Sequence, residues 1–481
     1  MPGSCPVPSV RVPFAQRPQP PPVSSSFPDP FEPDAALEDF LQRATRLLSG
    51  WLGSNRTAAP LPRLSVLPEV EPAPEGLDTE RLLGDLQLVM EGAFNPNHPG
   101  SLAHLDPPPL AASIVADLIC AGLNNNLLAE ELAPSLSHLE RRLCAWMARR
   151  LGLPDSGGGV AASGGSLSNL MALVVARDRR GPLPPGEGVV ICSEDAHVSL
   201  DKAIHVMGLP SGSLQRIPVD SGGRMRTDLL AGRLEGLERQ GVPVIAVVAT
   251  AGTTVRGAVD PLPPIAALCR HHGHWLHVDG AIGAVFALVG GHSHRVEGLG
   301  LADSVTVNPQ KLLGITKTSS LLLLAEPSLL LRSFATGLPY MESSWGGGQG
   351  GEAGLQGTRP AEILKLWLGL RQLGLEGIES LLGGAIERRR RLEALLSPVP
   401  ELLIHGGSLH LLAFRPRGAD AAAAEQWSHT VRRQLLDHRL LLSRPRYQGH
   451  HHLKAVLGNP HTRDGHLQRL ATIVRDSVTA C

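Results

Sequence analysis

The sequence predicts an α/β fold with a mostly parallel β-sheet covered by helices on both faces, followed by a smaller α+β domain at the C-terminus. Between residues 111 and 335, short apolar runs bounded by glycine, proline or polar residues alternate with stretches of helical periodicity. This alternation is typical of parallel strands joined by crossover helices. After a glycine-rich stretch at residues 346–354, a long helical pattern precedes two further apolar runs and a closing helix.

Each predicted strand is a short apolar run. Strands buried on both faces of a parallel sheet are nearly continuously apolar, because helices cover both sides. Sequence does not reveal the direction of the last strand of the large domain, which therefore stays open. The predicted strands are Val189–Cys192, Val244–Thr250, Trp275–Asp279, Ser304–Asn308 and Leu321–Ala325 in the large domain, and Leu409–Phe414 and His452–Leu457 in the small one.

The predicted helices repeat apolar residues at a spacing of three or four positions, which places them on one helix face. Several of these helices alternate with the strands of the large domain. The predicted helices are Ala35–Leu52, Ser113–Gly122, Pro134–Leu151, Leu167–Arg177, Ala196–Met207, Thr227–Arg239, Pro263–His272, Pro360–Leu396 and Arg463–Val478.

The N-terminal region differs in composition from the rest. Residues 1–35 contain eleven of the 41 prolines and few aliphatic side chains, so they cannot bury enough apolar surface to offset the entropy of ordering. We predict a disordered, proline-rich tail and arm over 1–60 and a segment packing on the large domain or a partner subunit over 61–110. The large domain then spans 111–335, a mobile glycine-rich loop 336–359, and the small C-terminal domain 360–481.

The overall composition excludes several classes of protein. The 481 residues carry 44 Lys and Arg against 45 Asp and Glu, a formal charge of −1, which gives no electrostatic basis for binding nucleic acid or an anionic membrane. No apolar run approaches the ~18 residues of a membrane-spanning helix. The six cysteines form no CxxC pair, which disfavours a disulfide framework or a structural zinc site. We expect a soluble, reduced, cytoplasmic protein.

Four polar features follow predicted strands, at the edge where ligands of open α/β sheets gather. Ser163–Ser166 opens a helix, Thr250–Thr254 and Asp279 end two strands, and Asn308–Lys311 follows a third. Alone, a Gly-Gly turn, a strand-end aspartate or a single lysine is usually structural. Their occurrence in order at successive strand ends points to one ligand site.

These motifs resemble the group II pyridoxal-phosphate-dependent amino-acid decarboxylases, which include glutamate, aromatic amino-acid and cysteine sulfinate decarboxylases. The resemblance covers roughly residues 80–475 and implies the fold type I architecture, a pyridoxal 5'-phosphate cofactor and a homodimer. The motifs are HPGSLAHL (98–105), SGGSLSNLMAL (163–173), SEDAHVSLDKA (193–203), TAGTTVRGAVDPL (250–262), HVDGAIG (277–283), ADSVTVNPQK (302–311) and GTRPAEILKLW (357–367).

The resemblance implies three catalytic residues. Lys311 takes the position of the lysine that forms the internal imine with the cofactor aldehyde, and a desolvated amine is the activated form of such a nucleophile. Asp279 matches the carboxylate that pairs with the pyridine nitrogen and keeps it protonated, so that the ring accepts electrons. His197 matches the histidine that stacks on the ring face.

The resemblance also implies the remaining cofactor contacts. Gly165 and Ser166 match the phosphate site, where backbone N–H groups at a helix N-terminus meet an anion, and Asn308 matches a further phosphate contact. Ala281 resembles the small residue beneath the ring. Thr253 resembles a nearby polar contact, although either threonine of the Gly-Thr-Thr sequence fits.

The substrate end departs most from the family pattern. His104 stands where glutamate decarboxylases have glutamine, and Lys454 stands where many relatives have an arginine near the substrate carboxylate. Gln310 replaces the histidine that usually precedes the imine lysine. The loop segment 341–356 lacks the family's tyrosine, and Tyr340 lies seventeen positions before Gly357, too early to match it.

We therefore predict a carboxy-lyase of amino-acid and carboxylic-acid metabolism that decarboxylates an L-amino acid to its amine. A small polar or acidic side chain is favoured over an aromatic one. The alternatives are a carbon–carbon lyase or an oxidative deaminase on the same scaffold, or a catalytically decayed binding protein. No metal site is predicted, because His271, His272, His274 and His277 match no zinc ligand spacing.

Overall fold

The computed structural model describes most of the chain in two compact units. One unit comprises residues up to Ala58 together with Pro62–Phe94, and the other comprises Ala59–Leu61 and the chain from Asn95 onward. Tyr340 and the first 25 residues lie outside the described residues. The described residues are 26–64, 67–72, 74–184, 186–337, 345–346 and 348–479.

The first unit contains two helices, α1 (Ala35–Gly53) and α2 (Thr79–Glu91). Each follows an aspartate, Asp34 or Asp78, whose carboxylate accepts backbone N–H groups of the first turn. This N-cap arrangement satisfies donors that have no partner within the helix. Helix α1 confirms the helix predicted for the N-terminal arm, whereas α2 is not among the predicted helices.

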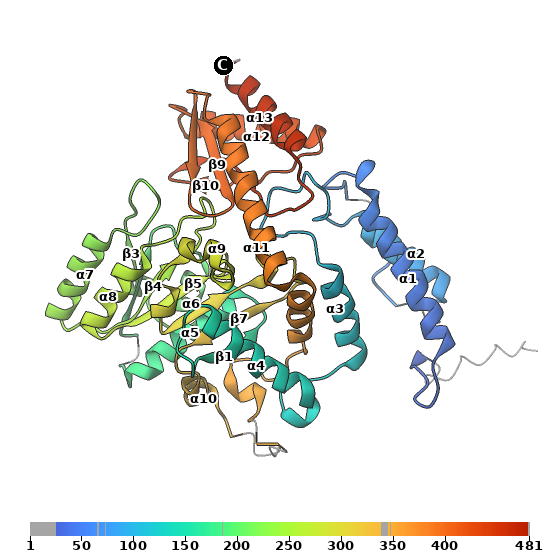
Figure 1. The fold of residues 1–481 in the computed structure, drawn as a ribbon, viewed down its shortest axis with the longest axis horizontal. Helices are drawn as coiled ribbons and strands as arrows, with labels where there is room; N and C mark the ends of the chain where they lie inside the picture. The colour runs from blue at the N-terminus through green and yellow to red at the C-terminus, as the bar shows by residue number, and fades with distance from the viewer. Residues whose placement is uncertain are drawn as a thin grey trace, which may run out of the picture. The chain divides into compact units, whose positions relative to one another are not determined.

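A seven-stranded sheet forms the centre of the second unit (Figure 1). Its strand order is β1-β7-β6-β5-β4-β2-β3. All five strands predicted for the large domain form, with ends within one residue of those predicted, whereas β1 and β3 are additional. The strands are β1 (Gly158–Ala162), β2 (Val189–Ser193), β3 (Leu214–Ile217), β4 (Val244–Thr250), β5 (Trp275–Gly280), β6 (Ser304–Val307) and β7 (Ser320–Leu324).

The sheet is mostly parallel, as predicted. Strands β2 to β6 all run in the same direction, whereas β7 is antiparallel to both β6 and β1. Strand β1 has the sequence Gly-Gly-Val-Ala-Ala, which reads as a turn rather than a strand. A Cβ on Gly159 would lie 1.9 Å from the Leu322 carbonyl oxygen, so this strand needs glycine because the β7 backbone approaches it closely.

Helices cover both faces of this sheet. On β2, Val190 packs in a cluster with Leu173 of α5, whereas its neighbour Ile191 packs in a separate cluster with Ile265 of α8. Successive side chains of a strand point to opposite faces, so each face needs its own helical layer. The helices of this unit's large sheet are α3 (Ala111–Leu123), α4 (Pro134–Arg150), α5 (Gly165–Arg180), α6 (Ser199–Val206), α7 (Thr227–Arg239), α8 (Leu262–His272), α9 (Gly290–Ser293) and α10 (Ser328–Phe334).

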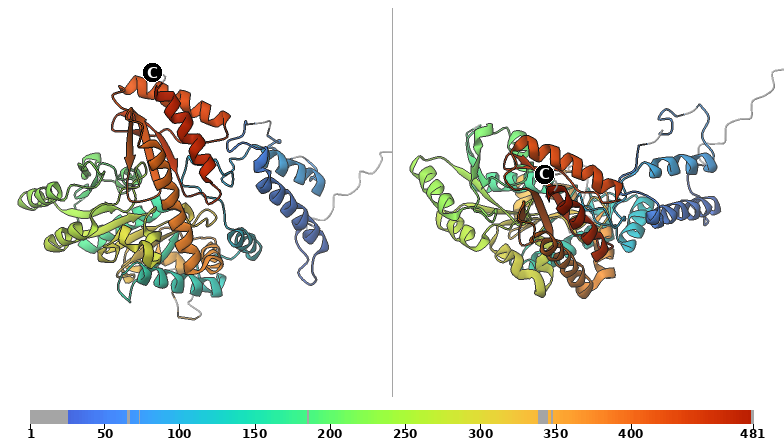
Figure 2. Two further views of the ribbon diagram at one scale, coloured as in Figure 1. Left: turned by 45° about the horizontal axis from the view of Figure 1, so that its top comes forward. Right: turned by 90° about the horizontal axis from the view of Figure 1, so that it is seen from above.

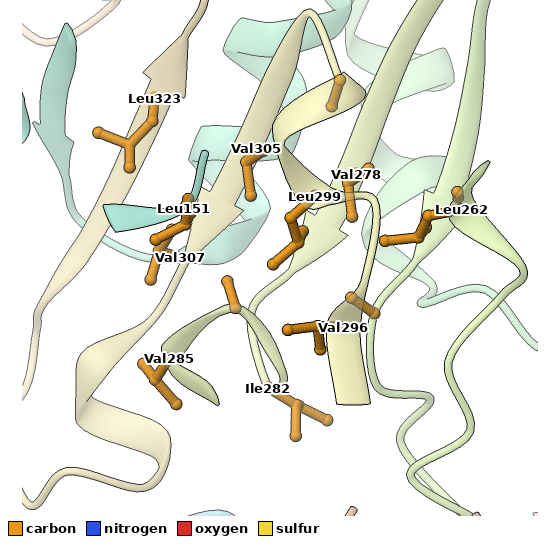
Figure 3. Close-up of a cluster of buried hydrophobic side chains, with 14 of the residues drawn as sticks. Leu151, Leu262, Val278, Ile282, Val285, Val296, Leu299, Val305, Val307 and Leu323 are labelled. Atoms are coloured by element: carbon orange, nitrogen blue, oxygen red, sulfur yellow. The ribbon is translucent and has the colours of Figure 1, made fainter. Parts of the chain in front are cut away.

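The larger of these clusters fills the space beside the centre of the sheet. Val278 of β5, Val305 of β6 and Leu323 of β7 lie in it with Leu299 and Ile282 from the connecting segments (Figure 3). Each of these side chains is 3% exposed or less, and burying one stabilises the fold by roughly 1.5–3 kcal/mol. This packing holds the strands whose ends carry the polar motifs.

A second hydrophobic cluster belongs to the C-terminal part of the chain. Here a three-stranded antiparallel sheet, in the order β12-β9-β8, is packed by two helices that lie side by side (Figures 1 and 2). Strand β8 and helix α12 are not among the predicted elements. The elements are β8 (Leu402–Gly406), β9 (Leu411–Pro416), α12 (Ala421–Asp437), the hairpin β10 (Arg446–Tyr447) and β11 (His450–His451), β12 (Leu453–Val456) and α13 (Asp464–Thr479).

Helix α11 (Ile363–Leu396) joins the two clusters. Leu382 belongs to the cluster of the large sheet and Leu396 to that of the small sheet. The helix is interrupted at Gly374, whose φ of 61° lies in the left-handed region that glycine adopts without steric penalty. Among the described residues, no helix is long and apolar enough to cross a bilayer, and no cluster of histidine, cysteine and acidic residues could hold a metal ion.

A buried ion pair fixes the segment that precedes α11. Nη1 and Nη2 of Arg359 lie 2.9 and 3.0 Å from the two carboxylate oxygens of Glu140, and both residues are 6% exposed or less. The same guanidinium donates to the carbonyls of Ala161 and Gly350. One arginine therefore ties α4, β1 and the glycine-rich segment together through charge-assisted bonds.

We expect Glu140→Gln to destabilise the protein by about 3 kcal/mol, because it leaves the buried guanidinium without a counter-charge. Urea unfolding followed by circular dichroism measures this loss. The control is Glu235→Gln, which removes the exposed partner of Arg239 and should change stability by no more than about 0.5 kcal/mol. Equal effects of the two substitutions would contradict the role given to the buried pair.

Candidate active site

A cavity of about 240 Å³ lies at the carboxyl ends of β4, β5 and β6. All eight residues predicted to contact the cofactor line it, although they come from five separate segments of the chain. The lining residues are Gly165, Ser166, Asn169, His197, Thr250, Gly252, Thr253, Thr254, Asp279, Ala281, Ile282, Asn308, Gln310 and Lys311.

The strand register brings the polar ends together. Thr250 of β4 lies opposite Asp279 of β5, and Asp279 lies opposite Thr306 of β6. The three strands therefore end at the same level, and the segments that follow them open into one space. This is the edge at which open α/β sheets bind ligands.

One end of the cavity is the N-terminus of α5. Gly164 precedes the helix with a φ of 144° and offers no side-chain cap, so no side chain of the residue before the helix covers its N-terminus. A Cβ on Gly165 would lie 3.1 Å from the Asn308 amide. With its oxygen toward Gly165, the Asn308 amide accepts that N–H at 3.2 Å and donates to Ser320 Oγ at 2.8 Å. This end suits an anion.

Asp279 is held by groups that donate to both of its oxygens. Asn169 Nδ2 donates to Oδ2 at 2.9 Å, and the Ala281 N–H donates to Oδ1 at 3.2 Å. The same Asn169 amide nitrogen lies 2.9 Å from Ser199 Oγ. Asn169 is a cavity-lining residue that sequence reasoning missed. Its signal was the helical spacing of four residues from Gly165, which puts both on the cavity side of α5.

Lys311 follows β6 in a short 3₁₀ turn, Pro309–Lys311. Burial lowers the pKa of its ammonium, while the negative charges of Asp279 and Asp106 act in the opposite direction. A lowered pKa increases the fraction of neutral amine, which is the nucleophilic form. The neighbouring Gln310 also lines the cavity, and its side-chain oxygen accepts the Ser319 N–H.

His197 lies in the turn between β2 and α6. The Ser199 N–H donates to His197 Nδ1 at 3.1 Å, so Nδ1 is an acceptor and the neutral ring carries its proton on Nε2. Burial lowers the pKa of this imidazole, and the charge of Asp279 partly offsets the effect. The geometry therefore favours a neutral ring with one N–H donor on Nε2.

Both threonines of the Gly-Thr-Thr turn line the cavity, so the structure does not choose between them. The Thr253 hydroxyl oxygen accepts the Ala258 N–H at 3.1 Å, which ties the turn to the following segment. The Thr254 carbonyl accepts a hydrogen bond from Lys454 Nζ at 3.3 Å. Thr254 thus links the cavity wall to the small sheet.

The two predicted substrate residues are not among the lining residues but lie close to this region. Lys454 on β12 is 6% exposed, and burial lowers the pKa of its ammonium to about 8, with the charge of Lys311 acting in the same direction. His104 is exposed, yet partial desolvation and then the charge of Lys454 lower its pKa. The charge of Lys454 therefore acts on His104 at the predicted substrate end.

Asp106 is a second residue that sequence reasoning missed. Its carboxylate lies 2.6 Å from Lys317 Nζ, and its charge raises the pKa of Lys311, Lys454 and His104. The signal was its position two residues after His104, directly after the end of the HPGSLAHL motif. This carboxylate and the nearby cations give the substrate end mixed charge.

A model of the pyridoxal-dependent decarboxylase conserved domain matches residues 65–415 of the chain. The chain belongs to the pyridoxal-dependent decarboxylase family. It is 29% identical over 385 residues to an L-2,4-diaminobutyrate decarboxylase from Acinetobacter baumannii, covering 74% of this chain and 75% of that relative. It is 33% identical over 347 residues to the cysteine sulfinic acid decarboxylase of Mus musculus, covering 68% and 69%.

Solved structures agree with this assignment. A crystal structure of mouse CSAD in apo form matches with a TM-score of 0.84 and 26% identity, covering 92% of this chain and 99% of that one. The predicted family resemblance and α/β fold class are confirmed. The chain is a pyridoxal-phosphate-dependent decarboxylase, and hence a carboxy-lyase.

The decarboxylase cavity fits pyridoxal phosphate on its own chemistry. The uncapped N-terminus of α5 suits the phosphate, and a side chain at Gly165 would fill that cradle. The Asp279 carboxylate suits the ring nitrogen and the Lys311 amine suits the aldehyde, all within one cavity. Bound cofactor would therefore have a partner for each of its three reactive or charged groups.

We expect Lys311→Ala to abolish covalent attachment of the cofactor and to lower decarboxylation by at least roughly 10³-fold, because the nucleophilic amine is removed. Borohydride reduction followed by peptide mass spectrometry detects the attachment. Lys202→Ala, which removes an exposed lysine of α6, is the control and should keep the reduced adduct. A reducible adduct that persists in Lys311→Ala would assign the attachment to another lysine.

Proposed function

We propose that the chain decarboxylates an L-amino acid with a short polar or acidic side chain, releasing carbon dioxide and the primary amine. The observation that carries this proposal is the gathering of Lys311, Asp279 and His197 around one cavity, with the buried ammonium of Lys454 bonded to its wall. Bound pyridoxal phosphate supplies the electron sink for the bond that breaks.

Each side chain has a separate task in this proposal. Lys311 Nζ would hold the cofactor through its aldehyde. The Asp279 carboxylate would accept a hydrogen bond from the protonated ring nitrogen and so keep that proton in place. The Nε2–H of His197 is a donor beside the ring and can deliver a proton after carbon dioxide leaves.

Lys454 supports binding of an anionic group of the substrate. Its ammonium is buried and its hydrogen-bond acceptor is the neutral Thr254 carbonyl. In the described part of the chain, no carboxylate lies within ion-pair distance of it. A buried cation without a counter-charge is unfavourable, so a substrate carboxylate would stabilise it.

A second candidate substrate has a side-chain ammonium. Asp106 favours it, because its carboxylate acts on Lys311 and Lys454 and could exchange its Lys317 partner for a substrate amine. The similarity to an L-2,4-diaminobutyrate decarboxylase supports the same possibility. The two candidate substrate classes therefore differ in side-chain charge: one has an acidic group, and the other has an ammonium that Asp106 would contact.

We expect carbon dioxide release to be faster with aspartate, glutamate, cysteine sulfinate or 2,4-diaminobutyrate than with tyrosine, tryptophan or dihydroxyphenylalanine. Measuring kcat/KM for this panel, with and without oxygen, tests the proposal. Asp106→Asn should lower kcat/KM for the diamino acid by at least roughly tenfold if Asp106 meets its ammonium, and should spare the acids. A clear preference for aromatic substrates, or oxygen uptake matching product, would overturn the proposal.

We expect kcat/KM to fall as pH rises through about 8, the pKa of Lys454. The lysine is charged below this pH and neutral above it, so it attracts a substrate carboxylate only at low pH. Above the pKa, kcat/KM should fall by about tenfold per pH unit. Lys454→Arg keeps its charge and should remove this limb of the profile. Lys454→Gln should have a low kcat/KM at every pH. If kcat/KM of the arginine variant still falls above about pH 8 as in wild type, the assignment to Lys454 is refuted.

We further propose that the enzyme acts as a cytoplasmic homodimer. Helix α3 packs against α11 on one side, yet Val115, Leu118 and Ile119 on α3 are each more than 40% exposed. Their spacing of three and four residues puts them on one helix face. An exposed apolar helix face supports a subunit contact.

A further inference from the structure

A chain of buried side-chain hydrogen bonds leads from Asp279 through Asn169, which also lines the cavity, to side chains that do not line it. Asn169 Nδ2 lies 2.9 Å from Asp279 Oδ2, and Asn169 Oδ1 lies 3.1 Å from His277 Nε2. His277 Nδ1 lies 2.8 Å from Ser304 Oγ, which accepts the indole N–H of Trp275 at 2.9 Å. His277 and Ser304 are completely buried and Asn169 is 1% exposed.

The chemistry of these groups fixes the direction of every bond. The Asp279 carboxylate only accepts hydrogen bonds, so the Asn169 amide must turn its nitrogen toward Asp279. The Asn169 oxygen therefore faces His277, whose Nε2 must carry a proton. Thr306 Oγ1 donates to the same Asn169 oxygen at 2.7 Å, which fixes the amide orientation a second time.

Burial favours the neutral form of His277 in this arrangement. With the proton on Nε2, Nδ1 accepts the hydroxyl proton of Ser304, and the indole of Trp275 donates to Ser304 in turn. Burial lowers the pKa of His277 to about 4, although the charge of Asp279 opposes this. The donors thus run in one direction, from Trp275 through His277 to the Asp279 carboxylate.

Holding the sheet together does not require this chain. His277 and Ser304 lie opposite one another in the β5–β6 ladder, where backbone bonds already set the register. Burying polar groups is unfavourable unless every group is paired. Apolar side chains at these two positions would avoid that cost. The chain ends on a carboxylate that is only 6% exposed, and a charge buried to this extent needs fixed hydrogen-bond donors.

We infer that His277 is a positioning residue for the decarboxylase: its Nε2–H fixes the Asn169 amide, so that Asp279 stays an ionised acceptor toward the cofactor ring nitrogen. This inference rests on the role proposed for Asp279. It assigns to His277 a function that acts through Asn169 and involves no contact with the cofactor. The residue is then part of the electrostatic machinery that keeps the ring nitrogen protonated.

Two cofactors that differ only at the ring nitrogen test this inference. The full-length chain, freed of cofactor, is titrated with pyridoxal phosphate and with its analogue in which a C–H group replaces the ring nitrogen. Because both carry the aldehyde and the phosphate, the ratio of their dissociation constants isolates the contact with Asp279. We expect wild type to prefer pyridoxal phosphate by roughly tenfold or more, as for a charge-assisted hydrogen bond.

The preference should fall toward one in His277→Leu, which lacks the donor. It should largely return in His277→Gln, whose amide N–H can replace Nε2–H toward Asn169. The matched control is His410→Leu, since His410 is also completely buried but neither ring nitrogen has a partner in the described residues. This control should keep the wild-type ratio. If His277→Leu does not fold, Asn169→Ala breaks the chain at its next link and should lose the preference in the same way.

The outcomes separate the inference from the proposed function. A wild-type ratio near one would remove the role of Asp279 and with it the proposed chemistry. A wild-type preference that persists in His277→Leu, or in Asn169→Ala where the leucine variant does not fold, would overturn only the inference. Loss in the leucine variant with recovery in His277→Gln would support both.

Discussion

The parallel register of β4, β5 and β6 is the constraint on which the rest of the site depends. Thr250, Asp279 and Thr306 stand side by side across these strands, so the segments that follow open into one cavity. A slip of one residue in β5 would turn Asp279 to the opposite face of the sheet. The apolar clusters on both faces oppose such a slip, because every buried side chain of the strand would exchange layers with it.

The same burial that sets the register also sets the protonation of the site. Desolvation lowers the pKa of both Lys311 and Lys454, and the charge of Lys311 lowers the pKa of Lys454 further. Asp279 is stabilised differently, by donors from Asn169 and Ala281 that are fixed before any ligand arrives. A neutral amine beside an ionised carboxylate is the combination that a carbonyl cofactor with a basic ring nitrogen requires.

Sequence reasoning yields specific predictions where one short segment carries the whole signal. The strand ends and the residues Lys311, Asp279 and His197 each belong to a motif that can be recognised without knowing its neighbours. It missed residues whose role depends on a contact with a residue far away in the sequence. Asn169 meets Asp279 across 110 positions, and β1 forms because Gly159 lets the backbone of β7 approach. Neither long-range pairing leaves a local pattern.

His277 illustrates the limit most clearly. In the sequence it is one of four histidines near the end of α8, and its neighbours His271 and His272 belong to that helix. In the fold, His277 lies on β5 and is completely buried, whereas His271 is exposed. Histidines that are adjacent in sequence therefore occupy unrelated environments, and only strand geometry separates them.

The cofactor end and the substrate end of the site are built from different parts of the fold. Residues that fit the cofactor all follow strands or begin helices of the seven-stranded sheet, whereas Lys454 comes from the small sheet and Asp106 from the segment before α3. Residues proposed to meet the substrate side chain can therefore vary while the strand ends that carry Lys311 and Asp279 stay in place. This separation explains how relatives named for diaminobutyrate and for cysteine sulfinic acid can share one fold at about 30% identity with this chain.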